Sequence, residues 1–190
     1  MGKGRLEAFS DGVIAIIITI MVLELQIPHE PTLGALGALL PVFLSYILSF
    51  VFVGIYWNNH HHLLHAVHKV NGRILWSNLF LLFWLSLIPF VTGWIGETNF
   101  AMWPMVLYGV VMWMCGLSYF ILSRALVTQE GPDSSLNRAV GRDRKGIASL
   151  VLYTSAIVLA FLNPWIAFVL YVGVAVLWFI PDRRIAAVIG

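Results

Sequence analysis

Charged residues are scarce in this sequence: they make up 11% of its 190 residues, while 60% are hydrophobic. The mean hydropathy is +0.89. A soluble domain carries roughly 25% charged and about 45–50% apolar residues, so this chain has too few polar groups to cover a surface that faces water. Soluble proteins are therefore excluded, and we expect the outer surface to contact the lipid bilayer.

Cysteine is nearly absent as well. The single Cys115 lies in an apolar run, which excludes an internal disulfide, and we interpret it as a small buried hydrophobic residue. The apolar stretch from Val13 to Leu25 is not followed by the small-residue cleavage site of a signal peptide. We therefore expect the first helix to remain in the mature protein.

Long apolar segments, in contrast, fill most of the chain. They run for about 17–28 residues, which suits a hydrocarbon core of roughly 30 Å at about 1.5 Å per helical residue. Proline marks several of their ends, because it lacks a helical N–H and disfavours helix at the residue before it. The sequence thus predicts an all-α integral membrane protein with a single domain, 1–190, of six transmembrane helices. Their approximate ranges are 12–27, 33–56 with a polar extension to 70, 74–95, 100–127, 147–162 and 164–180.

The positions of the basic residues predict the orientation. Six alternating helices place all 11 Lys and Arg residues on one side of the membrane, and the loops 29–32, 96–99 and 163–164 on the other side contain none. By the positive-inside rule the basic side, with both termini, is cytoplasmic. The same placement explains the pI of about 8.9 without a nucleic-acid partner. The basic residues are Lys3, Arg5, Lys69, Arg73, Arg124, Arg138, Arg142, Arg144, Lys145, Arg183 and Arg184.

Polar residues lie where the first helix enters the membrane, at Ser10 and Asp11. One interpretation is an N-cap, since both side chains accept N–H bonds at the positive end of a helix dipole. The other is a functional site, because polar residues at the edge of a membrane helix are costly.

The apolar part of the first helix also has two interpretations. Gly12, Ile16, Thr19 or Ile20, and Leu23 share one helical face. That face either packs or contacts lipid, or it lines a pore whose hydrophobic constriction gates by dewetting. We expect the Thr19 hydroxyl to bond to its own helix, and Glu24, which follows this face, to be an interfacial carboxylate.

The run Arg5-Leu6-Glu7-Ala8-Phe9-Ser10-Asp11 matches the Arg-x-x-x-Phe-Ser-Asp signature of the endosomal and lysosomal potassium channels and their bacterial relatives. The apolar run from Gly12 to Leu25 is similar to the pore helix of that family. The resemblance covers essentially the whole chain, because the helix number, the His and Trp residues after helix two and an Asn in helix three also agree. With one six-helix repeat instead of the two of animal members, the chain resembles the bacterial branch.

The resemblance implies a leak-like, potassium-permeable channel that is not an enzyme and needs no cofactor. Its first helix lines a central pore, with the constriction at Ile16, the next turn at Thr19 or Ile20, and the outer ring at Leu23. It also implies a homotetramer in the inner (plasma) membrane of the cell, because one helix cannot enclose a pore. Isoleucine at 16–18 departs from the family pattern and leaves the strength of potassium selectivity open. The sequence contains no Thr-Val-Gly-Tyr-Gly filter.

In that family the signature residues brace helix one against helices two and three instead of coordinating the ion. We therefore expect Trp57, His61 and Asn78 to be the partners of Ser10 and Asp11. The complete expected network is Arg5, Phe9, Ser10, Asp11, Trp57, His61 and Asn78.

Five of the six histidines lie between His60 and His68. His61, His65 and His68 would share a helical face, and imidazoles so placed bind zinc or another transition metal. No cysteine or carboxylate nearby in the sequence completes such a site, so a hydrogen-bonded cluster that braces helix one is the preferred interpretation and no metal site is assigned. Proton sensing is the third possibility, since histidine titrates near neutral pH.

Other functions fit the sequence less well. A proton-coupled or metal-handling secondary transporter that uses the His60–His68 segment is the main alternative, but transporters typically show broken helices and intramembrane charges in paired halves. A membrane enzyme lacks support because the sequence shows no nucleophile–base pair and no carboxylate pair inside a helix. A structural scaffold remains open.

Overall fold

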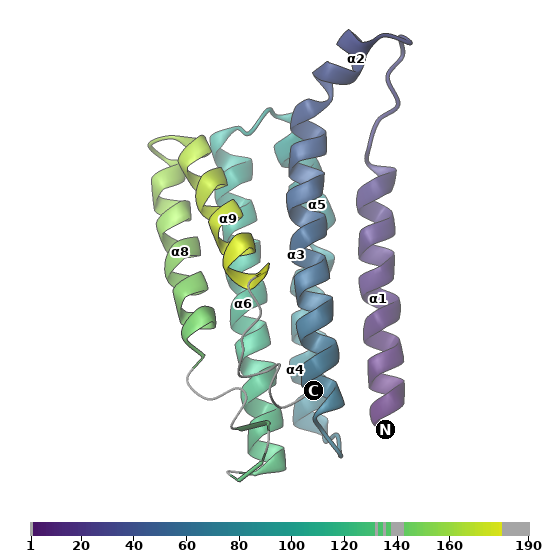
Figure 1. Ribbon diagram of the computed structural model, residues 1–190, viewed down its shortest axis with the longest axis vertical. Helices are drawn as coiled ribbons and strands as arrows, with labels where there is room; N and C mark the ends of the chain where they lie inside the picture. Colours follow the sequence, from purple (N-terminus) through teal and green to yellow (C-terminus); the bar gives the residue numbers. More distant parts are fainter. Residues whose placement is uncertain (1, 132, 135, 138–142, 180–190) are drawn as a thin grey trace.

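The computed structural model describes residues 2–131, 133–134, 136–137 and 143–179, and every regular element in these ranges is a helix (Figure 1). Several of the helices are long, and two pairs are separated by a single residue. The helices are α1 (Lys3–Leu23), α2 (Leu33–Ala38), α3 (Leu40–His65), α4 (Gly72–Ser86), α5 (Ile88–Glu97), α6 (Met102–Glu130), α8 (Arg144–Ala160) and α9 (Pro164–Phe179).

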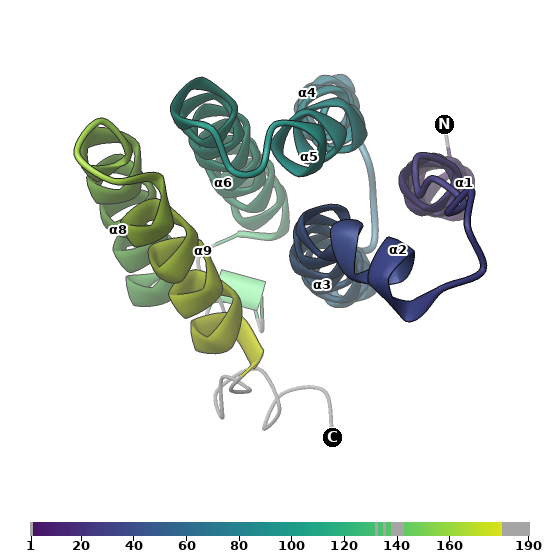
Figure 2. The ribbon, with the colours of Figure 1, turned by 90° about the horizontal axis from the view of Figure 1, so that it is seen from above.

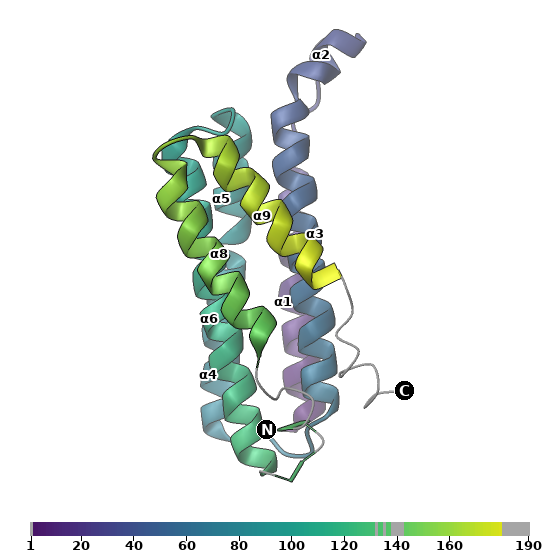
Figure 3. The ribbon, with the colours of Figure 1, turned by 60° about the vertical axis from the view of Figure 1, so that its left-hand side comes forward.

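The helices form an elongated bundle in which α1 stands at one side. Seen from above, α3 and the α4–α5 column separate α1 from α6, while α8 and α9 cover the opposite side (Figure 2). Within the bundle α1 packs against α3, α4 and α5, and α6 packs against α4, α5 and α8. Figure 3 shows α9 crossing obliquely from the end of α8 towards α3, with which it is in contact.

Four helical stretches are long and apolar enough to cross a membrane, which agrees with the membrane protein expected from composition. They are Lys3–Leu23, Leu40–His65, Gly72–Glu97 and Met102–Glu130. The third stretch combines α4 and α5, whose axis is interrupted at Leu87. Pro89 causes the interruption, because its ring removes an N–H and clashes with the preceding turn. The remaining two long elements, α8 and α9, have 17 and 16 residues.

Several predicted boundaries differ from the structure. The second helix was expected as one element from 33 to 70, but it is divided at Leu39, two residues before Pro41, and α3 ends at His65. The first helix begins at Lys3, well before Gly12, and ends at Leu23 instead of 27. The predicted ends of the fourth and fifth helices lie within three residues of those of α6 and α8. The expected end of the sixth at 180, and the basic residues Arg138, Arg142, Arg183 and Arg184, lie outside the described residues.

Close helix contacts and hydrogen-bonded polar groups characterise the core. A Cβ at Gly96 would lie 2.8 Å from the Cα of Val42, so glycine is what lets α5 approach the backbone of α3. The buried Tyr171 hydroxyl donates to the carbonyl of Met105 at 2.9 Å. The Thr92 hydroxyl donates to the carbonyl of Ile88 at 2.7 Å. Such pairing is required because a polar group without a partner in an apolar interior is costly. Cys115 is buried and free, as the sequence predicted.

Candidate functional site

The first helix, α1, has one face that is buried within its own subunit. Leu6, Ser10, Ile14, Ile17 and Met21 are each at most 2% exposed and recur at intervals of three or four residues. This spacing places them along one stripe. The stripe fixes how α1 is rotated about its axis against α3, α4 and α5.

The opposite face of α1 is left uncovered by the subunit. Ile16 is 59%, Ile20 43% and Leu23 76% exposed, and Gly12 and Thr19 are exposed on the same side. The Thr19 hydroxyl donates to the carbonyl of Ala15 at 2.9 Å, so its hydrogen is used within the helix. From Gly12 to Leu23 this face has no ionisable side chain. It is a continuous apolar strip with one hydroxyl near its middle.

A buried chain of hydrogen bonds connects the other face to α3 and α4. Asn78 Nδ2 donates to Ser10 Oγ at 2.9 Å, and Ser10 Oγ donates to the carbonyl of Leu6 at 2.9 Å. Asn78 Oδ1 lies 2.7 Å from His60 Nε2. Because a carbonyl oxygen can only accept, His60 is protonated on Nε2 and every donor points the same way. Ser10 and Asn78 have no exposure and His60 has 1%, so each link is shielded from competing water.

A second link joins α1 to α3 nearer the surface. Trp57 Nε1 on α3 donates to Asp11 Oδ1 on α1 at 3.0 Å. Asp11 is two turns inside α1, and the N-cap position belongs to Gly2. The N-cap interpretation of Ser10 and Asp11 is therefore wrong, because their oxygens serve neighbouring helices and not the first turn. The remaining signature residues, Arg5 and Phe9, are exposed.

The structure assigns different partners to the histidines than the sequence suggested. His61 was expected to contact Ser10 or Asp11, but its Nδ1 lies 3.4 Å from Glu7 Oε1. The buried position next to Asn78 belongs to His60 instead. The sequence does not show which of the three consecutive histidines faces α4. Adjacent residues of a helix point about 100° apart, so the answer depends on how α3 is rotated about its own axis.

The expected alignment of His61, His65 and His68 is wrong for the last of the three. α3 ends at His65, so His68 leaves the helical face, and its Nδ1 lies 3.0 Å from Glu130 Oε2. His65 remains next to His61, with ring centroids 5.8 Å apart.

At the other end of α1, Glu24 lies against α5. A Cβ at Gly93 would lie 2.6 Å from Glu24 Oε2, so glycine allows this approach. Glu24 and Glu97 both line a hollow of about 520 Å³. Partial burial and, to a lesser degree, the charge of Glu97 raise the pKa of Glu24 above its usual 4.5. This carboxyl group therefore gains a proton more readily than one surrounded by bulk water.

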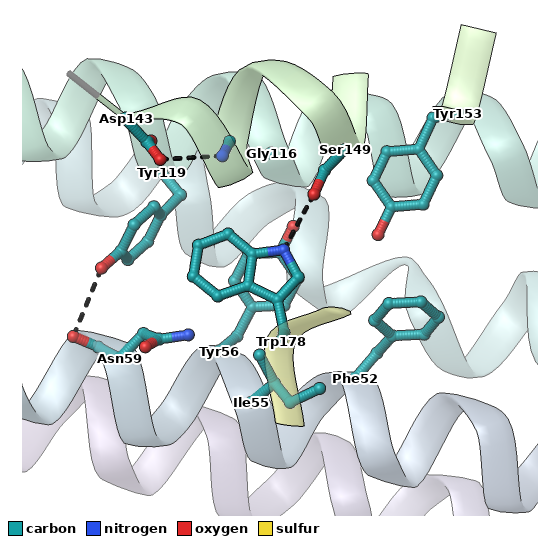
Figure 4. Close-up of a pocket in the computed structure, with 11 residues that line it drawn as sticks. Phe52, Ile55, Tyr56, Asn59, Gly116, Tyr119, Asp143, Ser149, Tyr153 and Trp178 are labelled. Atoms are coloured by element: carbon teal, nitrogen blue, oxygen red, sulfur yellow. Dashed lines mark hydrogen bonds between the residues drawn. The ribbon is translucent and has the colours of Figure 1, made fainter. Parts of the chain in front are cut away.

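A second cavity, between α3, α6, α8 and α9, is nearly filled by aromatic side chains (Figure 4). Its volume of about 30 Å³ leaves room only for water-sized molecules. Trp178 lies at its centre, and its Nε1 donates to Ser149 Oγ at 2.8 Å. The hydroxyl of Tyr119 donates to the carbonyl of Asn59 at 3.4 Å. These hydrogen bonds connect α9 to α8 and α6 to α3, so we assign this cavity a structural role.

Comparison with known proteins identifies relatives across the whole chain. Residues 5–89 match the family described as "Endosomal/lysosomal potassium channel TMEM175". A protein from Chryseobacterium named a potassium channel is 52% identical over 185 residues, which cover 97% of this chain and 96% of that protein. A rat protein named "Endosomal/lysosomal proton channel TMEM175" is 35% identical over 101 residues, 47% of this chain and 20% of the rat protein.

A solved structure has the same fold. It is the crystal structure of a lysosomal potassium-selective channel TMEM175 homologue from Chamaesiphon minutus, with a TM-score of 0.83 and 25% sequence identity. The superposition covers 96% of this chain and 97% of that chain. The agreement therefore extends well beyond the signature segment.

Proposed function

This chain belongs to the family of TMEM175 potassium channels, which are not enzymes, and from that premise we propose that it is a leak-like potassium channel whose pore is lined by α1. The relative from Chryseobacterium that shares 52% of its residues is named a potassium channel. The Chamaesiphon homologue with the same fold is described as potassium-selective.

One observation carries the pore assignment: α1 is anchored along one face and uncovered along the other. The buried Ser10–Asn78–His60 chain fixes the anchored face. A helix that only contacted lipid would not need such polar anchors, which are costly to bury and are justified where rotation must be fixed. The uncovered face carries the strip of Ile16, Thr19, Ile20 and Leu23.

This strip would form a hydrophobic constriction instead of a carbonyl filter. Ile16 narrows the pore, Thr19 and Ile20 form the next turn, and Leu23 forms the outer ring. Branched apolar side chains gate by controlling whether water occupies the constriction. Potassium is the permeant ion, and the activity requires no cofactor.

A pore that is enclosed on all sides requires several copies of α1. A homotetramer, with four α1 helices around one axis, satisfies this requirement, and each subunit supplies six membrane helices. The start of α1, the end of α3, the start of α4 and the end of α6 lie at the same end of the bundle (Figure 1). The basic residues Lys3, Arg5, Lys69, Arg73 and Arg124 lie in or next to these segments, which favours a cytoplasmic location for this end of the bundle and the N-terminus. Six membrane helices, an even number, would bring the C-terminus to the same side. The proposed location is the inner (plasma) membrane.

The test is cation flux in liposomes that contain the purified protein. Passive flux down the gradient, faster for potassium than for sodium, is expected, and protein-free liposomes provide the control. Flux that requires a proton gradient would overturn the proposal and favour the transporter alternative at His60–His68.

A further inference from the structure

We propose that Glu7, His61 and His65 form a binding site for a divalent transition-metal ion of the zinc class, which joins α1 to α3. Each of the three side chains offers one ligand atom, and these atoms lie within 4.8 Å of one another. Glu7 comes from α1, whereas both histidines come from the last two turns of α3.

The distances are close to those that a bound ion requires. Zinc bonds of about 2.0–2.2 Å in a tetrahedral site separate ligand atoms by roughly 3.3 Å. Glu7 Oε1 and His61 Nδ1 are already 3.4 Å apart. The remaining adjustment of His65 is a side-chain rotation, because this residue is exposed and at the end of its helix.

The donor set suits zinc chemically. Histidines four residues apart lie on one helical face, and a carboxylate from a second element completes a three-ligand set with an open position for water. Two nitrogen donors and one oxygen donor favour zinc-class ions over magnesium or calcium, which prefer oxygen ligands. The ring of Trp57 stacks on His61 with centroids 6.1 Å apart and limits its orientation.

A simple ion pair explains less of the geometry than a metal site. It accounts for Glu7 and His61, but it gives no role to His65, whose ring stacks on that of His61. A metal ion would use all three groups and would neutralise the carboxylate. Lys3 opposes binding, because its Nζ lies 2.9 Å from the carbonyl oxygen of His65 and brings a positive charge to the site.

The site does not depend on ion conduction, so it is tested by binding. The full-length protein, with any affinity tag removed and traces of metal chelated, is titrated with zinc by calorimetry, and its Tm is measured at each zinc concentration. One zinc per chain and a Tm that rises with zinc are expected, because an ion that binds only the folded state stabilises it.

Variants identify the ligands. Glu7→Gln and His65→Gln are each expected to weaken zinc binding at least about tenfold, as changes around metal sites commonly do. His62→Gln is the matched control, since this adjacent histidine lies outside the three-residue set, and it should bind zinc as the native chain does. Lys3→Gln preserves all three ligands and should tighten binding a few-fold.

Three results would overturn the proposal: less than one zinc per chain in the native protein, native affinity in Glu7→Gln, or an equal loss in His62→Gln. If either ligand variant fails to fold, the Lys3→Gln titration decides, and unchanged affinity there counts against the site.

Discussion

Replacing Asn78 with leucine should destabilise the protein strongly although the number and branching of the side-chain heavy atoms do not change. The Asn78 amide bonds to Ser10 of α1 and to His60 of α3 from its position on α4, and all three side chains are buried. Leucine fills the space but can neither donate nor accept. The variant therefore removes both hydrogen bonds while it keeps the branched shape of the side chain, and the larger methyl groups add to the destabilisation.

The magnitude follows from the groups left without partners. His60 Nδ1 already lacks a hydrogen-bond partner within the described part of the chain, so the loss of Nε2 bonding would leave both ring nitrogens unpaired. One buried unsatisfied group costs about 1–3 kcal/mol. Ser10 retains its bond to the Leu6 carbonyl and loses only the bond that it accepts, worth about 0.5–1.5 kcal/mol. The expected loss is about 2–4 kcal/mol, or about 5–15 °C in Tm for a chain of this size.

The assay is equilibrium unfolding in detergent, supported by thermal melting. Ser77→Ala is the matched control, because the Ser77 hydroxyl bonds to the Arg73 carbonyl within α4 and joins no other helix in the described part of the chain. Its effect should remain below about 1 kcal/mol. Combining Ser10→Ala with Asn78→Leu should be less destabilising than the sum of the two, since residues in one network couple. If Asn78→Leu unfolds like the native chain, the buried network does not hold α1 in place.

Further predictions concern the pore strip, the anchors and the ends of the helices. Ile16→Asn should raise potassium conductance by keeping the constriction wet, and unchanged single-channel currents would contradict the pore assignment. Asp11→Ala should weaken the oligomer, as measured by size-exclusion chromatography, and should leave the ion selectivity of the assembled protein unchanged. A stable oligomer with altered selectivity would instead place Asp11 in the ion path. Gly96→Ala should lower stability by about 1–3 kcal/mol, because its methyl group would collide with the backbone of α3; a Tm equal to that of the native chain would refute this packing argument. The pKa of Glu24 is raised, so the folded protein holds the Glu24 proton more tightly than the unfolded chain does. The stability that this protonation contributes should be lost as the pH rises from 4.5 through the raised pKa. Glu24→Gln should flatten this part of the pH–stability curve, and an unaltered curve would mean that another group titrates there.

Composition and apolar length were sufficient to predict the membrane class and most helix positions. The errors fall where a local rule competes with tertiary contacts. Ser10 and Asp11 have the residue types of an N-cap, but α3 and α4 supply partners that make it favourable to continue the helix back to Lys3. Pro41 and Pro89 were missed as interruptions because the apolar pattern continues through both of them.

The site was predicted in its residue types more than in its pairings. The sequence suggested that Trp57 and Asn78 belong with the first helix, and the structure places them at Asp11 and Ser10. It could not select His60 over His61, and it could not place Glu7 next to His65, because those choices depend on how two helices distant in sequence are rotated against each other. Glu7 is the carboxylate that the histidine segment lacked when only its own neighbours were considered.

Thiol modification of α1 tests most directly whether its uncovered strip lines the ion path. Leu23→Cys would place a thiol on the strip, whereas Met21→Cys would place one on the buried face, where the native side chain is 2% exposed. The native Cys115 is fully buried and should not react. A charged thiol reagent should block potassium flux through Leu23→Cys and leave Met21→Cys and the native protein unaffected. Flux through fully modified Leu23→Cys that matches the native rate would contradict a pore lined by α1.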